Sequence, residues 1–314
     1  MFMPTLQERI AGGFWGLLVG DALGVPYEFH HPNDLPPHHA LEMIPPSSFR
    51  RAHASVLPGT WSDDGAQALI LLSSLLERGT LDLDDFGGRL VAWYEHGYLA
   101  VDNHVFDVGV QTSQAIRALR AGTPAQAAGP NHEHANGNGS LMRVLPLALW
   151  HRGSDAELVW DAHFQSQVTH GHLRSQVCCA LYCLWARRLL DCFPDAWNDA
   201  VTTLRTIYTT TSKAYAELEW QVRPDDVPEG QGSGYVVDCL RSARLAVKYG
   251  SYEDVVKGAI GLGHDTDTTA CVAGGIAGIR DGLGAIPARW MQALRGKDIA
   301  EPLLQQLIQH RTTA

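Results

Sequence analysis

Four glycines recur at every fourth position near the start of the chain. Gly12, Gly16, Gly20 and Gly24 lie within, and at the end of, an apolar stretch with helical periodicity. Residues four apart share one face of a helix, so these glycines form a stripe without side chains. Each interior glycine costs a helix up to about 1 kcal/mol relative to alanine. The row therefore predicts that the backbone of another element packs closely against this face.

Helical periodicity continues along most of the remaining sequence, and no segment shows the sustained alternation that is typical of a half-buried strand. One helix is expected over 62–78, with Ser62 as its N-cap and Gly79 following its last residue. Further helices are expected over 83–97, 111–121, 141–152, 155–167, 172–191, 196–218, 236–249, 252–262, 267–281 and 287–309. The pattern predicts an all-α fold, an orthogonal bundle of many helices.

No boundary between domains is marked in the sequence. It has no Ser/Gly linker and no internal repeat, so one domain is expected over residues 1–314. Hydrophobic residues make up 45% and charged residues 18%, which favours a large buried interior. Residues 26–58 contain seven prolines that break regular structure. A connection of this length is usually functional or mobile.

The formal net charge of −10 argues against general nucleic-acid binding, which needs a basic surface. An anionic ligand would have to find its positive charge locally, at a metal ion or a helix N-terminus. The apolar N-terminal stretch is too short to span a bilayer and lacks a basic leader, so a cytoplasmic location without membrane association is expected. The six cysteines include no CxxC pair and are typical of buried thiols in a reducing compartment, with a zinc site as the weaker alternative.

Two adjacent carboxylates open the helix expected over 62–78. Asp63 and Asp64 follow Ser62 directly, and two like charges at this spacing repel each other. Carboxylates in a first helical turn are stabilised by the helix dipole by about 0.3–1 kcal/mol each. By itself, this segment is therefore consistent with an ordinary helix start.

A second segment repeats the arrangement near the end of the chain. The sequence DTDT at 265–268 again places oxygen-bearing side chains where a helix begins. It is not an EF-hand, because Ala270 stands where the loop needs Gly and Ile276 where it needs Glu. Four carboxylates from two helix starts are sufficient for two hard divalent cations, Mg²⁺ or Mn²⁺, about 3.5–4 Å apart. The sequence therefore predicts a binuclear metal cleft.

Seven segments in a fixed order carry a more specific signal. They are GLLVGDALGVPYEF, GTWSDDGAQALILL, FDVGVQT, NGNGSLMRVLPLAL, VTHGH, GSGYVVDCL and LGHDTDTTACVAGGIAGIRDG. Together they resemble the ADP-ribosylglycohydrolase family, the ADP-ribosyl-acceptor hydrolases, over nearly the whole chain. The resemblance implies an all-α fold with two Mg²⁺ ions at the bottom of an ADP-ribose cleft.

The same resemblance implies particular site residues. The implied metal ligands are Ser62, Asp63, Asp64, Asp265, Asp267 and Thr268, where Ser62 replaces the usual Thr and keeps its hydroxyl. The implied cleft residues are Gly139, Ser140 and Met142 beside the distal ribose, His170 on the ribose or phosphate, and Tyr235 stacked on adenine. Gly109 would let backbone N–H groups approach a diphosphate at a helix start. A capping serine, a core histidine and a packing tyrosine are the ordinary structural alternatives.

Two further carboxylates are candidate catalytic groups. Glu28 opens the proline-rich segment, and the resemblance places it over the metal ions as a base or as part of a lid. Asp107 has the structural alternative of capping the helix expected at 111–121. Relatives that act on ADP-ribosyl-arginine carry Asp in this motif and are thought to protonate the ribose ring oxygen with it.

These observations predict a Mg²⁺-dependent hydrolase that removes ADP-ribose from a modified acceptor. The ions would bind the 2″ and 3″ hydroxyls of the distal ribose, and Asp107 or Glu28 would transfer the proton. Asp107 favours arginine on a protein as the acceptor, with free ADP-ribose as product; serine, nucleic acid and small ADP-ribose esters stay open. The alternatives are a non-catalytic ADP-ribose-binding relative and an unrelated metallophosphatase that uses the same aspartates.

Overall fold

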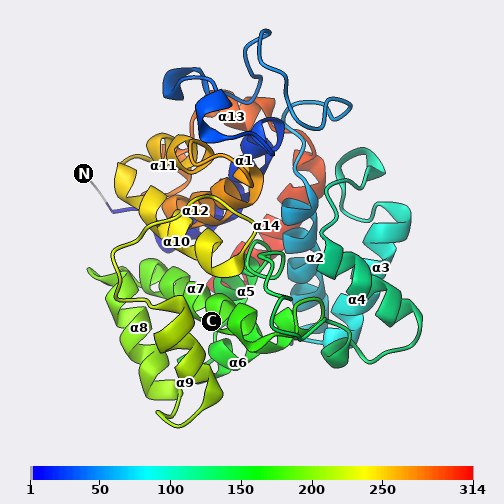
Figure 1. Cartoon of the computed structure of the whole chain (residues 1–314), viewed down its shortest axis with the longest axis vertical. Coiled ribbons are helices and arrows are strands. Elements are labelled where there is room, and N and C mark those ends of the chain that lie inside the picture. The colour runs from blue at the N-terminus through cyan, green and yellow to red at the C-terminus, as the bar shows by residue number, and fades with distance from the viewer. Residues whose placement is uncertain (1–2, 314) are drawn as a thin grey trace.

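A computed structural model describes residues 3–313, and helices form most of it (Figure 1). The described residues form fourteen α-helices: α1 (Leu6–Gly24), α2 (Asp63–Arg78), α3 (Leu83–His96), α4 (Val110–Arg120), α5 (Leu145–Trp150), α6 (Asp155–Gln167), α7 (Leu173–Leu190), α8 (Ala196–Ile207), α9 (Lys213–Glu217), α10 (Val236–Ala246), α11 (Tyr252–Ile260), α12 (Thr266–Asp281), α13 (Ala288–Ala293) and α14 (Lys297–Thr312). Over residues 3–313, β-type pairing is limited to one isolated bridge between Gly137 and Tyr235. The all-α prediction is confirmed.

Most of the expected helix ends agree with the structure, because their caps are local. The Ser62 hydroxyl accepts from the backbone N–H of Asp64 at 3.2 Å, and Gly79 ends α2 in the left-handed conformation at φ 67°. Three expected helices are wrong in extent. The helix expected over 141–152 is only α5, because Pro146 occupies its first turn and the residues before it form turns.

The other two expected helices are each divided. The helix expected over 196–218 breaks after Ile207, and Ser212 then caps α9 by accepting from the N–H of Tyr215 at 3.1 Å. Ser and Thr side chains compete for backbone hydrogen bonds in this way, and the break falls in a Thr- and Ser-rich run. The helix expected over 287–309 is divided into α13 and α14 at Gly296, whose φ is 68°.

The glycine stripe of α1 faces α12, as the spacing predicts for a backbone partner. A Cβ atom added at Gly16 would lie 2.5 Å from the carbonyl oxygen of Gly274, and one at Gly12 or Gly20 would overlap the α12 backbone. Gly24 meets the first turn of α12 in the same way. Close packing along the whole pair fixes where α12 begins relative to the end of α1, at the centre of the molecule in Figure 1.

One connected set of buried apolar side chains runs from Ile10 to Leu307. Helices α3 and α4 lie beyond α2 at the right of Figure 1, and α8 and α9 lie at its lower left. No helix in residues 3–313 is both long enough and apolar enough to cross a bilayer. Five of the six cysteines are buried and Cys192 is exposed; all six are free thiols.

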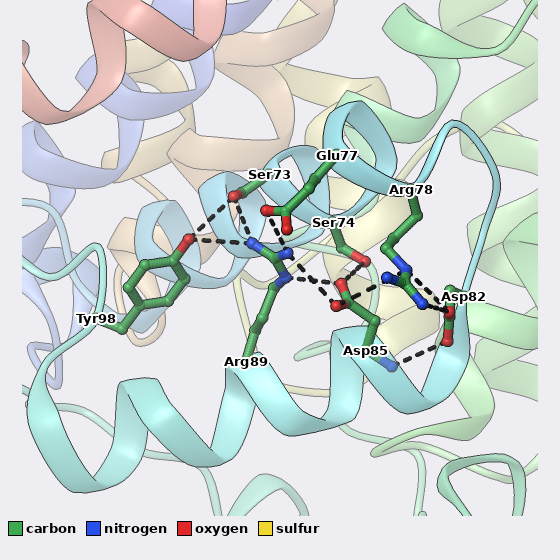
Figure 2. Close-up of polar contacts among 8 residues, drawn as sticks. All are labelled: Ser73, Ser74, Glu77, Arg78, Asp82, Asp85, Arg89 and Tyr98. Carbon is green, nitrogen blue, oxygen red and sulfur yellow. Dashed lines mark hydrogen bonds and ion pairs between the residues drawn. The ribbon is translucent and has the colours of Figure 1, made fainter.

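A polar cluster fixes α3 onto the second half of α2 (Figure 2). Arg89 of α3 donates to Asp85 at 2.7 Å, to Glu77 at 2.6 Å and to the Ser73 hydroxyl at 2.9 Å. The Arg89 side chain is only 14% exposed. Tyr98, at the start of the loop that leads to α4, shares the hydroxyl of Ser73. The cluster therefore holds the α3–α4 loop, which carries Asp107, against α2.

The proline-rich segment 26–58 contains only short 3₁₀ turns, as its composition predicts. It is nevertheless tied down. The Tyr27 hydroxyl donates to the carbonyl of Glu42 at 2.7 Å, and the Glu42 carboxylate accepts from Trp290 Nε1 of α13 at 2.6 Å. Lys257 of α11 lies 3.3 Å from the same carboxylate. These contacts hold the segment against α11 and α13.

Candidate active site

The starts of α2 and α12 lie together, and both helices pack on α1. The Thr268 hydroxyl donates to Asp64 Oδ1 at 3.4 Å, which joins the first turns of the two helices. A cavity of about 260 Å³ opens beside them. Carboxylates from four separate segments line it: Glu28, Asp63, Asp64, Asp107 and Asp265.

The carboxylates at the base of this cavity are buried without a cationic partner. Asp64 Oδ2 and Asp267 Oδ2 are buried and find no hydrogen-bond donor among residues 3–313. Burial and, after it, repulsion from neighbouring carboxylates raise the pKa of Asp63, Asp64 and Asp267 well above the usual value. An isolated buried carboxylate costs several kcal/mol unless a cation neutralises it.

The donor set at this place fits a hard cation. Ligand atoms of Glu28, Asp265 and Asp267 lie within 4.8 Å of one another. Carboxylates and the nearby Thr268 hydroxyl supply oxygen donors only, which suits Mg²⁺, Mn²⁺ or Ca²⁺ rather than a soft metal. The residues present therefore fit a divalent metal site between the two helix starts.

Asp21 supports the first turn of α2, a role that the sequence did not reveal. This fully buried α1 carboxylate accepts from the backbone N–H groups of Ser62 at 2.9 Å and Gly65 at 2.7 Å. Burial raises its pKa to about 7. It thus satisfies the free N–H groups at the start of α2 and orients the turn that carries Asp63 and Asp64. The available sequence signal was a single carboxylate, Asp21, within the apolar, glycine-rich part of α1.

A second unforeseen contact connects the site to a buried cation. Asp63 Oδ2 accepts from Gln67 Nε2 at 2.9 Å, and Gln67 Oε1 accepts from Arg143 Nη1 at 2.9 Å. Arg143 is fully buried, which lowers its pKa to about 10, and it also donates to the Gln165 side chain at 3.1 Å. The amide of Gln67 separates the guanidinium from Asp63, so the carboxylate is oriented without being neutralised directly.

Glu28 and Asp107 lie close together at the cavity, where ligand atoms of Glu28, His53 and Asp107 are within 4.8 Å of one another. His53 Nε2 lies 2.6 Å from Glu28 Oε2 and 3.8 Å from Asp107 Oδ1. Burial and, after it, repulsion from the Asp107 carboxylate raise the pKa of Glu28 to about 10. Burial and, after it, repulsion from the Asp265 carboxylate raise the pKa of Asp107 to about 6. Sequence reasoning missed His53, because the proline-rich segment has no periodicity that would place it opposite Glu28.

Asp107 does not cap α4, which was its structural alternative. The N-cap is Gly109, and no side chain caps this helix start. Asp107 itself adopts a left-handed backbone conformation with φ 57°, as do Phe29 at 62° and His53 at 46°. Such conformations are unfavourable for non-glycine residues and concentrate at functional sites. Three of them meet at the mouth of this cavity.

Gly109, Gly139, Met142 and His170 form a further part of the cavity wall. A Cβ atom at Gly139 would lie 2.8 Å from the ring of His170, so only glycine fits there. His170 Nδ1 lies 2.8 Å from the Thr169 hydroxyl, and burial lowers its pKa to about 3. The histidine is therefore neutral and held in one orientation.

Comparisons with known proteins agree with this arrangement. A family model described as ADP-ribosylglycohydrolase matches residues 3–314. The chain belongs to the ADP-ribosylglycohydrolase family. This confirms both the resemblance and the prediction of a glycohydrolase enzyme.

Two relatives of this ADP-ribosylglycohydrolase are named for their substrates. The chain is 31% identical over 303 residues to ADP-ribosylarginine hydrolase Tri1 of Pseudomonas putida (strain GB-1), covering 96% of this chain and 78% of that protein. It is 28% identical over 302 residues to ADP-ribosyl-[dinitrogen reductase] glycohydrolase of Rhodospirillum rubrum, covering 93% and 92%. A solved structure titled "ADP-ribosylglycohydrolase-related protein complex" matches with a TM-score of 0.77 and 31% identity over 97% of this chain and 98% of that one.

Some residues implied for this ADP-ribosylglycohydrolase lie off the cavity surface. Ser62 is the buried N-cap of α2, and Asp267 lies beneath the cavity with its unpartnered oxygen. Ser140 is fully buried behind the wall, where its hydroxyl accepts from Ser166 Oγ at 2.8 Å. Tyr235 lines an adjacent cavity of about 590 Å³, and its hydroxyl lies 3.2 Å from Arg174 Nη1.

Proposed function

We propose that the protein is a Mg²⁺-dependent hydrolase that releases ADP-ribose from ADP-ribosylated arginine on a protein. The observation that carries the proposal is the pair of buried, unpartnered carboxylate oxygens, on Asp64 and Asp267, at the base of the cavity. The name of the Pseudomonas putida relative supports arginine as the acceptor.

Two Mg²⁺ ions are proposed between the first turns of α2 and α12. The ligands would be Ser62, Asp63, Asp64, Asp265, Asp267 and Thr268, with Mn²⁺ as an equivalent cation because all the donors are oxygen. Bound ions supply positive charge for the hydroxyls of the distal ribose. Asp21 and Gln67 hold the ligating turn in place through hydrogen bonds to Ser62, Gly65 and Asp63.

Asp107 is proposed as the group that protonates the ribose ring oxygen. A pKa of about 6, raised by burial, lets a carboxyl group both carry and release a proton near neutral pH. Protonation opens the C1″–O4″ bond as the lone pair of the attached guanidine nitrogen forms a C1″=N bond. Water then adds to C1″ and returns a proton to Asp107, directly or through Glu28. The C1″–N bond breaks as the new hydroxyl proton moves to the nitrogen, which releases arginine, and the 4″-hydroxyl closes on the C1″ aldehyde to give ADP-ribose. Glu28 is either the base for this water or part of a lid, and His53 holds its carboxylate over the cavity in both cases.

The remaining cavity residues would hold the ADP-ribose. Backbone N–H groups at Gly109 suit the diphosphate, because no side chain occupies this helix start. Gly139, Met142 and His170 would contact the distal ribose, with Ser140 supporting this wall from behind. The half-exposed Tyr235 would stack on adenine in the adjacent cavity. We retain the expectation of a cytoplasmic enzyme that binds an ADP-ribosylated protein and neither nucleic acid in general nor a membrane.

A substrate panel tests this function. ADP-ribosyl-arginine, ADP-ribosyl-serine, ADP-ribosylated nucleic acid and a small ADP-ribose ester are each incubated with enzyme plus Mg²⁺ or plus EDTA. The expected result is release of free ADP-ribose from the arginine conjugate, abolished by EDTA and restored by Mg²⁺. Release from another conjugate alone would change the acceptor, binding without release would indicate a non-catalytic module, and release of inorganic phosphate would indicate a phosphatase.

Variants of Glu28 separate its two proposed roles. Glu28→Gln keeps the size of the side chain but removes its basic oxygen. If Glu28 is the base, the substitution should reduce kcat by about 10²–10⁴-fold. If Glu28 is instead part of a lid, the substitution should mainly change KM and the rate of product release.

A further inference from the structure

Three aromatic side chains lie together beside the carboxylates Glu28 and Asp107 of the active-site cavity, and we call them the aromatic rim: Phe29, His53 and Phe106. The centroid of the His53 ring lies 5.6 Å from that of Phe29 and 5.1 Å from that of Phe106. His53 therefore stands between the two phenyl rings. The three rings come from the proline-rich segment and the α3–α4 loop, which meet at this point.

The aromatic rim directly adjoins the two candidate acid/base groups, Glu28 and Asp107. Phe29 follows Glu28 in the sequence, and Phe106 precedes Asp107. His53 contacts both carboxylates, at 2.6 Å and 3.8 Å. The three rings are therefore the aromatic surface that adjoins the two candidate acid/base groups.

Packing within the protein does not explain the position of Phe29. Its side chain is 70% exposed, although its backbone adopts φ 62°. The segment is nonetheless held firmly: the Phe29 N–H donates to the carbonyl of His264 at 2.6 Å, and the His264 N–H donates to the carbonyl of His30 at 2.7 Å. A large apolar ring kept in water by an unfavourable backbone conformation is typical of a contact surface.

We propose that the aromatic rim is the acceptor subsite and that it recognises a planar cation, the guanidinium group. The inference rests on the proposed function and specifies which residues select the acceptor. A guanidinium stacks on aromatic faces and is attracted by the negative potential of those faces. A hydroxyl acceptor such as serine has neither a planar face nor a charge, so it gains little from this surface.

The test compares two substitutions of the same exposed residue. Phe29→Leu keeps an apolar side chain but removes the ring, and Phe29→Trp keeps an aromatic face. For an ADP-ribosyl-arginine peptide, Phe29→Leu should lower kcat/KM by about 3- to 30-fold, the range of a cation–π contact, and Phe29→Trp should keep it near the wild-type value. The Kd for ADP-ribose, which lacks the acceptor, should stay unchanged in both variants.

Ile44→Ala is the matched control, because Ile44 is also 70% exposed and lies in the same proline-rich segment but outside the aromatic rim. It should leave kcat/KM unchanged. Unchanged kcat/KM in Phe29→Leu, or an equal loss of ADP-ribose affinity, would overturn the acceptor subsite alone. Failure of the wild-type enzyme to release ADP-ribose from any conjugate would overturn the proposed function and this subsite with it.

Discussion

The two ends of α2 carry acidic clusters of opposite character. At its start, Asp63 and Asp64 are buried, and burial raises the pKa of both. At its other end, α2 meets Asp82 and Asp85, whose carboxylates pair with arginine side chains (Figure 2). The hydrogen bond from Arg89 holds the pKa of Asp85 below its usual value against the effect of burial. The first cluster lacks positive charge, and the second already contains it.

The contrast distinguishes a site from a structural contact. A protein that needed only to join α2 to its neighbours would pair its carboxylates, as the Arg89 cluster does. Buried carboxylates that only neutral donors orient are unfavourable for folding, and this supports the proposal that an external cation completes them. The same reasoning makes Asp21, Gln67 and Arg143 supports of the site rather than partners of a ligand.

The largest expected effect is that of Asp267→Asn, which replaces one unpartnered carboxylate with a neutral amide. Mg²⁺ binding measured by calorimetry should be lost, and the rate of ADP-ribose release should fall by about 10⁴-fold, because metal charge stabilisation is worth several kcal/mol. Without metal, the variant should unfold at a temperature no lower than the wild type, since one buried charge is gone. Asp85→Asn, in the arginine-paired cluster, is the control, and this variant should bind Mg²⁺ with the wild-type affinity. A variant that kept both metal and rate would show that the ligands are misassigned.

Asp107→Asn should have the next largest effect and separates proton transfer from metal binding. The amide keeps the shape of the side chain but has no transferable proton, so kcat on ADP-ribosyl-arginine should fall by about 10²–10⁴-fold. The Kd for ADP-ribose and the affinity for Mg²⁺ should change little. Near-normal turnover with metal bound would exclude Asp107 from the mechanism and would also weaken the preference for arginine, which rests partly on this residue.

Arg89→Met tests the paired cluster and should affect stability rather than metal binding. Methionine keeps much of the apolar stem but leaves Asp85 and Glu77 without their shared cation. The free energy of unfolding in urea should fall by about 2 kcal/mol, between the values for exposed and buried pairs. Arg78→Met, at a side chain that is 48% exposed, should cost at most about 1 kcal/mol. Equal losses in the two variants would contradict the role of burial in this cluster.

Local signals explain what the sequence could predict about this fold. The starts of α2 and α12 and the end of α2 depend on residues within one or two turns, and they are found as expected. The glycine stripe predicted a close backbone partner because its spacing has no other simple explanation, yet it could not identify α12. Weak local preferences decided the breaks at Ser212 and Gly296, which helical periodicity alone overlooked.

The missing parts of the candidate site depend on contacts between distant segments. Asp21 is separated from Ser62 by 41 residues, and Gln67 from Arg143 by 76, so no periodic pattern connects them. His53 lies in a segment without regular structure, where only tertiary contacts decide which way a side chain points. The sequence therefore indicated which carboxylates could bind metal, and the structure was needed to find what orients them.

The smallest expected effect concerns His163, a buried ionisable group with only neutral partners. It adds a third case to the comparison of the two acidic clusters of α2. His163 lies in α6 away from the cavity, with its ring 2.5 Å from the Tyr208 hydroxyl and 3.1 Å from Gln176 Oε1. Burial lowers its pKa to about 4, against about 6.5 in an unfolded chain. Because the folded protein favours the neutral ring, this contribution to stability is present above pH 6.5 and is lost as the pH falls towards 4. At pH 5.5 the loss is on the order of 1 kcal/mol relative to pH 8.

Urea unfolding of the wild type and of His163→Gln at several pH values measures this contribution of His163 to the free energy of unfolding. The variant lacks the titrating ring, so from pH 8 to pH 5.5 the wild type should lose on the order of 1 kcal/mol of unfolding free energy relative to the variant. Any constant cost of the substitution cancels in that comparison. A constant difference would mean that His163 titrates alike in the folded and unfolded chains. Unlike the carboxylates at the start of α2, this group needs no external ion, so Mg²⁺ should leave the pH dependence of the difference unchanged.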